Sequence, residues 1–206
     1  MSMTSLFPMF VKLTGRRCLV VGGGAVAEGK AEGLLARGAT VALVAPDVTE
    51  KIGRWEREGR LTWHARRFQP ADLKDTFLVF AATGVDAVNE SVFREAEARG
   101  ILCNAVDEPD RCHFYCPAVV RRGPLQIAIS TGGLSPALAS RLRRELEEQF
   151  GPEYERWLKE LGQMRREVFA RRTDPRRRAR LLRRFASRRG FEHFLRAERR
   201  RTGGSA

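Results

Sequence analysis

The sequence has no long apolar run, and only 8% of its residues are aromatic. No stretch approaches the roughly 18 uninterrupted apolar residues that a membrane-spanning helix requires. The N-terminus also has no basic region followed by a long apolar one, because Lys12 interrupts the only candidate. These absences predict a protein without a membrane span or secretion signal, located in the cytoplasm.

Cysteine is scarce, with four residues at Cys18, Cys103, Cys112 and Cys116. Without a secretion signal an even count does not indicate disulfides, so we expect free thiols. Cys112 and Cys116 lie on either side of His113, but the spacing matches none of the usual zinc patterns. We therefore predict no metal site, and a metal role for these two thiols stays open.

Acidic residues are scarce at the C-terminal end. From Arg171 onward there are 14 arginines and three acidic residues, whereas the first 170 residues hold 24 basic and 22 acidic ones. A basic tail of this kind is typical of a solvated helix face, of a site for a polyanionic small molecule, or of nucleic-acid binding. We rank these readings in that order, with nucleic acid last.

The clearest local pattern begins with the apolar run Leu19–Val21, which leads directly into three glycines. Gly22, Gly24 and Ala27 fit G-x-G-x-x-G/A, followed by helical periodicity that Gly38 ends. The first position makes a tight turn, the second lets the backbone approach a pyrophosphate, and the third packs the helix on the strand. The pattern predicts dinucleotide binding, and a sharp turn without a ligand is the alternative.

Segments with strand and helix patterns alternate through residue 106. We expect strands at 40–45, 61–65, 77–82 and 101–106, and helices at 51–59 and 89–99. This order predicts an α/β fold with a Rossmann-type, doubly wound parallel sheet, whose ligands lie beyond the carboxyl ends of the strands.

Asp47 lies about 20 residues beyond the glycines, where an acidic residue commonly binds the ribose hydroxyls. It follows Pro46, and no arginine stands beside it in the sequence to bind a 2′-phosphate. The sequence therefore favours NAD over NADP.

The pattern changes after Pro117. Residues 119–120 and 125–129 read as two strands around a turn, and residues 136–150 and 153–169 read as amphipathic helices. Residues 181–195 predict one more helix, broken near Gly190.

Residues 103–118 read CNAVDEPDRCHFYCPA, and residues 126–139 read QIAISTGGLSPALA. Together with the glycine stretch, these motifs resemble the precorrin-2 dehydrogenase family, the NAD-dependent part of siroheme synthases, over about residues 4–165. The resemblance implies a homodimer that oxidises precorrin-2 to sirohydrochlorin with NAD as acceptor. Some members also insert ferrous iron, acting as ferrochelatases, and the residue types here leave that second activity open.

The resemblance assigns roles to individual residues. Asp107 matches the catalytic aspartate, although Asp107 and Glu108 alone would read as an acidic turn. The expected cofactor contacts are Gly22, Gly24, Ala25, Val26, Pro46, Asp47, Ala81, Ala82 and Thr83. For the substrate, a polycarboxylate tetrapyrrole, the expected contacts are Asn104, Arg111, Ser130, Thr131 and Arg141.

We predict three parts: an NAD-binding Rossmann domain (1–117), a dimerisation segment (118–149) and a helical C-terminal region with the arginine-rich tail (150–206). The length leaves no room for a methyltransferase domain. Two rival functions remain: an NAD(H)-sensing regulator that binds nucleic acid through its tail, and an NAD-dependent oxidoreductase for another small anion.

Overall fold

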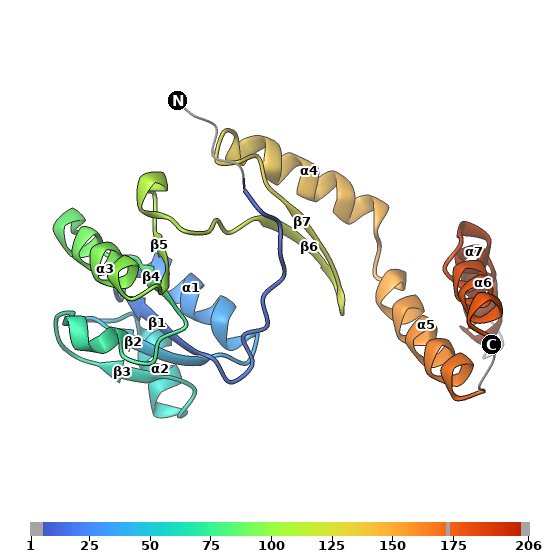
Figure 1. The fold of residues 1–206 in the computed structure, drawn as a ribbon, viewed down its shortest axis with the longest axis horizontal. Helices are drawn as coiled ribbons and strands as arrows, with labels where there is room; N and C mark the ends of the chain where they lie inside the picture. The colour runs from blue at the N-terminus through green and yellow to red at the C-terminus, as the bar shows by residue number, and fades with distance from the viewer. Residues whose placement is uncertain (1–5, 172–173, 203–206) are drawn as a thin grey trace. The chain divides into compact units, whose positions relative to one another are not determined.

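The computed structural model describes residues 6–171 and 174–202. The chain divides into two units, one ending at Cys116 and the other beginning at Pro117. Figure 1 shows the helices and strands of each unit. The units are described separately below.

The first unit contains a five-stranded parallel sheet with the order β3-β2-β1-β4-β5. Its strands are β1 (Arg17–Val21), β2 (Thr40–Val44), β3 (Thr62–His64), β4 (Leu78–Ala81) and β5 (Leu102–Ala105). The helices are α1 (Ala25–Leu35), α2 (Glu50–Arg57) and α3 (Asp86–Ala98), with short 3-10 turns at Pro70–Leu73 and Pro109–Arg111. The predicted doubly wound sheet is confirmed, and the strand order changes direction between β1 and β4, where ligands bind in such sheets.

The core lies on both faces of the sheet, because successive side chains of a strand point to opposite faces. Cys18 and Val20 of β1 pack with Ala27 of α1, whereas Leu19 and Val21 belong to the cluster around α3. All four of these side chains are buried. This two-sided burial explains why the central strands read as continuous apolar runs.

The second unit begins with the antiparallel hairpin of β6 (Ala118–Arg122) and β7 (Leu125–Ile129), which turns at Gly123 with a φ of 56°. It continues with the helices α4 (Pro136–Gln149), α5 (Glu153–Ala170), α6 (Pro175–Phe185) and α7 (Arg188–Thr202). Aromatic contacts join α5 to α7, with the Tyr154 and Phe191 ring centroids 4.6 Å apart. No helix in the two described ranges is long and apolar enough to cross a membrane.

The prediction of one helix at 181–195, broken near Gly190, is wrong. Helix α6 begins at Pro175 and ends at Phe185, and Gly190 lies inside α7. The break falls at Ser187, whose hydroxyl accepts a hydrogen bond from the Gly190 amide (3.2 Å) in the manner of a helix cap. A Cβ on Gly190 would lie 2.1 Å from the Phe185 carbonyl oxygen. The glycine therefore allows a close approach between two helices.

Candidate active site

A cavity of about 910 Å³ lies at the carboxyl ends of the strands of the first unit. It is lined by the glycine turn after β1, the segment after β2, the turn after β4 and the start of α3. The residues predicted from the sequence that line it are Gly22, Gly24, Ala25, Val26, Pro46, Asp47, Ala82, Thr83 and Asp107. One cavity thus brings together eight of the nine expected cofactor contacts and the expected catalytic carboxylate.

The three glycines of the turn have different structural roles. Gly22 has a φ of 126°, and a Cβ there would lie 2.2 Å from the Ala82 carbonyl oxygen. A Cβ on Gly23 would lie 1.9 Å from the Asp47 carbonyl oxygen, whereas a Cβ on Gly24 would meet no atom within 4 Å. The first two glycines are therefore required by neighbouring backbone, and the third leaves open space in the cavity wall.

That open space lies where helix α1 begins, with Gly24 in the N-cap position. No side chain caps this end, and the first amides of a helix have no acceptor within it. Such amides and the positive end of the helix dipole bind phosphate groups. The residues of the turn therefore fit the pyrophosphate of a dinucleotide.

Asp107 follows β5 in a left-handed backbone conformation with a φ of 64°. Its side chain is exposed on the cavity and has no hydrogen bond or ion pair to another described residue. Asp and Asn adopt this conformation more readily than other non-glycine residues. The turn thus presents an unpaired carboxylate to the cavity.

Asn89, a residue that the sequence analysis did not select, holds the turns around the cavity. It is buried in α3 and its amide oxygen accepts hydrogen bonds from the Thr83 amide (3.2 Å) and hydroxyl (2.7 Å). Its amide nitrogen donates to the Glu108 carboxylate (3.0 Å), next to Asp107. The sequence carries one signal for this role. Asn89 is a polar residue three positions before the buried Val92, on the inner face of the helix.

Arg67 was also missed, and it lines the cavity together with Asp47. Its side chain is exposed and has no hydrogen bond or ion pair to another described residue. The neighbouring Arg66 is instead paired with Asp72 (2.8 Å). No arginine stands next to Asp47 in the sequence, but the fold places Arg67 in the lining of the same cavity.

Three other predicted residues of the first unit are not among those that line this cavity. Ala81 is fully buried in the core. Asn104 is buried and donates to the Phe114 carbonyl (2.8 Å), which fixes the segment that follows Asp107.

The third of these residues, Arg111, is held by the protein's own carboxylates. It contacts Asp86 at 2.7 Å, lies 3.8 Å from Glu90 and is also paired with Glu108. The hydrogen bond to Asp86 is the main cause of the raised pKa of Arg111, which stays charged. Binding a substrate carboxylate would require Arg111 to exchange one of these partners.

The remaining predicted substrate contacts lie in the second unit. The Ser130 and Thr131 hydroxyls accept hydrogen bonds from the Gly132 and Ser135 amides, each at 3.1 Å. Arg141 is exposed on α4 and lies 3.5 Å from Glu145.

The four cysteines are free. Burial raises the pKa of Cys18 to about 11 and that of Cys103 to about 12, so both are neutral thiols at physiological pH. Among the described residues there is no group of three or more His, Cys, Asp or Glu side chains that would hold a metal ion.

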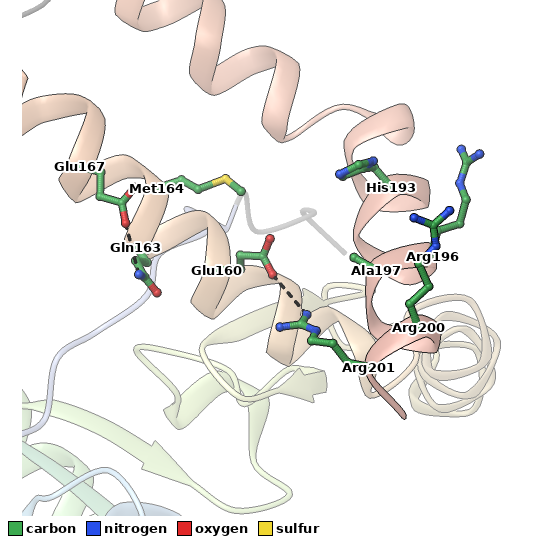
Figure 2. Close-up of a pocket in the computed structure, with 9 residues that line it drawn as sticks. All are labelled: Glu160, Gln163, Met164, Glu167, His193, Arg196, Ala197, Arg200 and Arg201. Atoms are coloured by element: carbon green, nitrogen blue, oxygen red, sulfur yellow. Dashed lines mark hydrogen bonds and ion pairs between the residues drawn. The ribbon is translucent and has the colours of Figure 1, made fainter. Parts of the chain in front are cut away.

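A second cavity, of about 860 Å³, lies between α5 and α7 in the second unit (Figure 2). Helix α5 contributes Glu160, Gln163, Met164 and Glu167, and helix α7 contributes His193, Arg196, Ala197, Arg200 and Arg201. The walls carry charges of both signs, and Arg201 lies 4.0 Å from Glu160.

Comparison with known families decides the class of the first unit. A family model for NAD(P)-binding domains matches residues 9–118. The chain belongs to this family. The predicted cofactor, NAD, and the Rossmann-type fold are therefore confirmed. A second model, described as sirohaem biosynthesis protein central, matches residues 122–149.

Similar proteins agree with this assignment. Siroheme synthase 2 of Yersinia enterocolitica is 42% identical over 175 residues, which cover 83% of this chain and 37% of the relative. Siroheme synthase of Xylella fastidiosa is 45% identical over 148 residues, covering 71% of this chain and 31% of the relative. The chain thus spans about a third of the length of these relatives.

A solved structure described as SirC, precorrin-2 dehydrogenase, superposes with a TM-score of 0.77 at 29% identity. The match covers 93% of this chain and 98% of that one. The resemblance inferred from the sequence motifs is confirmed by these findings together.

Proposed function

We propose that this chain catalyses the NAD-dependent dehydrogenation of precorrin-2 to sirohydrochlorin, a step of siroheme biosynthesis. The observation that carries the proposal is the position of Asp107, whose unpaired carboxylate lines the same cavity as the glycine turn. The similarity to siroheme synthases and to a precorrin-2 dehydrogenase supports this choice of substrate.

The reaction removes a hydride and a proton from the macrocycle. When bound, NAD supplies the hydride acceptor. The first turn of α1 and the space beside Gly24 would hold the pyrophosphate, and Asp47 would accept hydrogen bonds from the ribose hydroxyls. The Asp107 carboxylate accepts the proton. It has no ion pair to a described residue that would have to break first.

The substrate carries eight carboxylates, so its contacts should include cations and hydrogen-bond donors. We propose Asn104, Arg111, Ser130, Thr131 and Arg141 for this role. Arg141 is the most accessible of these cations, because it is exposed and its carboxylate neighbour, the exposed Glu145, lies 3.5 Å away.

A homodimer is part of the proposal, with the segment 118–149 as its interface. Leu134, in the loop between β7 and α4, is 78% exposed, and Leu138, in α4, is 39% exposed. Apolar side chains exposed in this way are typical of a surface that another subunit covers. The division into three parts and the cytoplasmic location stay predictions.

Ferrous iron would be a second substrate if the chain also acts as a ferrochelatase. The same Asp107 carboxylate would then accept the pyrrole N–H protons. The alternative function, an NAD(H)-sensing regulator that binds nucleic acid, would use the basic tail but leaves Asp107 without a role.

The test is an anaerobic assay with enzymatically generated precorrin-2 and NAD. NADH and the sirohydrochlorin spectrum should appear together, and siroheme should form faster than background after ferrous iron is added if the second activity exists. NAD binding without either product would contradict the proposed reaction while leaving the family assignment intact.

A further inference from the structure

Helix α6 has arginines on its exposed face and no carboxylate within the helix. The exposed arginines are Arg176, Arg177, Arg180, Arg183 and Arg184, called the α6 arginines below. None of their side chains has a hydrogen bond, ion pair or ring contact to another described residue. The opposite face, with Leu181, Leu182 and Phe185, is half-buried.

Other helices of this chain place a carboxylate one turn from a basic residue. Arg143 and Glu147 in α4 are 2.7 Å apart, as are Lys159 and Glu155 in α5. Such pairs stabilise a helix slightly, and like charges at the same spacing destabilise it by a similar amount. In α6, Arg180 has arginines four residues away on both sides. The helix therefore keeps a repulsion that a bound polyanion would relieve.

The cavity between α5 and α7 differs in this respect (Figure 2). Its Arg201 lies 4.0 Å from Glu160, and its Arg196 lies 4.0 Å from Glu192. Two of the arginines there thus already have carboxylate neighbours. The α6 arginines should therefore attract an external anion more strongly than the cations of this cavity do.

A membrane surface is the poorer partner for α6. Insertion into a lipid interface needs a free apolar face. Here Arg178 lies over the Phe169 ring of α5 (4.4 Å to the centroid), on the side of the half-buried leucines. The apolar face of α6 is occupied by its own unit.

We propose that the α6 arginines are a capture surface for the polycarboxylate tetrapyrrole, which they attract electrostatically before it reaches the site of dehydrogenation. This rests on the proposed function, which supplies a ligand with many carboxylates. Arg176 and Arg184 are about 12 Å apart along the helix axis at 1.5 Å per residue, so one macrocycle meets several arginines. A field of one sign raises association rates by about 10–10³-fold at low salt.

The test compares the full chain with Arg176→Gln/Arg180→Gln/Arg183→Gln. The matched control is Arg57→Gln/Arg60→Gln/Arg94→Gln, which removes the same charge from exposed positions of the first unit. At about 20 mM salt the α6 variant should lose about tenfold in kcat/KM for precorrin-2 with kcat unchanged, and the difference should shrink at about 300 mM. The control should stay within about twofold of the parent chain. An α6 variant with the parent kcat/KM and salt dependence overturns the proposal.

A binding measurement separates this inference from the reaction itself. Uroporphyrin, a stable octacarboxylate, should bind the parent chain and the control variant more tightly than the α6 variant, whether or not precorrin-2 is oxidised. Equal uroporphyrin affinity in all three overturns the inference even if dehydrogenation is observed. Loss of duplex DNA binding in the α6 variant, with kcat/KM unchanged, would assign the surface to nucleic acid instead.

Discussion

The amide nitrogen of Asn89 donates a hydrogen bond to the Glu108 carboxylate, with 3.0 Å between the two atoms. The oxygen of the same amide accepts from the Thr83 backbone and hydroxyl. One buried side chain therefore joins the turn after β4 to the turn that carries Asp107. Both turns line the cofactor cavity, so Asn89 positions the site without being among the residues that line it.

Replacing Asn89 by Ala should weaken the fold and the site together. The Thr83 amide would lose its acceptor and the Glu108 carboxylate one of its two donors, at a cost of about 1–3 kcal/mol in the free energy of unfolding. We expect urea denaturation to show this loss and NAD titration to show weaker binding. Glu97→Ala, an exposed position on the same helix, is the control. An Asn89→Ala protein with parental stability and NAD affinity would contradict the role of Asn89.

Gly24→Ala should leave the fold intact and weaken NAD binding. The added Cβ meets no protein atom within 4 Å, and the φ of −81° is open to alanine. The Cβ would occupy the space proposed for the pyrophosphate. We therefore expect the Kd for NAD to rise about tenfold or more, which is a loss of about 1.4 kcal/mol or more of binding free energy. Gly29→Ala in α1 also meets no atom within 4 Å and should bind NAD normally. Parental NAD affinity in Gly24→Ala would place the cofactor elsewhere.

Asp107→Asn should separate chemistry from binding. Asn tolerates the φ of 64° but cannot accept the proton, so we expect NAD affinity to persist while dehydrogenation falls about 10²-fold or more. Asp75 has a similar φ of 56° and is not among the residues that line the cavity, so Asp75→Asn should retain activity. Near-normal turnover in Asp107→Asn would remove the carboxylate from the mechanism.

Arg67→Ala should change the discrimination between the two dinucleotides. Because Arg67 and Asp47 line one cavity, the arginine would attract a 2′-phosphate that the carboxylate repels. We expect weak NADP binding in the parent chain and about a tenfold loss of it in the variant, with a smaller effect on NAD. The ratio of the two Kd values, measured also for Arg60→Ala, checks this. An unchanged ratio would mean that Arg67 does not contact the adenosine half.

The ion pair of Arg66 and Asp72 should make stability depend on acid pH. Burial raises the pKa of Asp72, but the hydrogen bonds from Arg66 and from the Gln69 amide outweigh it, so the pKa is lowered overall. The stabilisation is thus present above the unfolded pKa of about 3.9 and is lost as the pH falls through the lower folded value. Asp72→Asn should cost about 1–3 kcal/mol at pH 7.

Denaturation curves between pH 7 and about pH 2 would test this sign. The difference in stability between the parent chain and Asp72→Asn should shrink below about pH 4. A difference that stays constant with pH would show that the carboxylate charge is not the cause.

The sequence alone determined the parallel sheet, the glycine turn and part of the lining of the cavity proposed for the cofactor. These features depend on neighbours along the chain: a buried strand followed by Gly22 and Gly24 fixes the turn, and Ala27 fixes how the helix packs. The cap of α6 was equally local, in Asp174 and Pro175, since the Asp174 carboxylate accepts from the Arg177 amide at 2.9 Å.

Only the tertiary structure decided which side chains meet across distant segments. Arg67 and Asp47 line the same cavity because the parallel strands β3 and β2 that precede them end at the same edge of the sheet. Asn89 reaches Glu108 because α3 packs against β5. The sequence shows that the tail is rich in arginine, but the fold determines that the α6 arginines lack carboxylate partners, whereas Arg156 of α5 and Arg201 of α7 have them. Contacts of this kind depend on where whole elements pack, which no local pattern specifies.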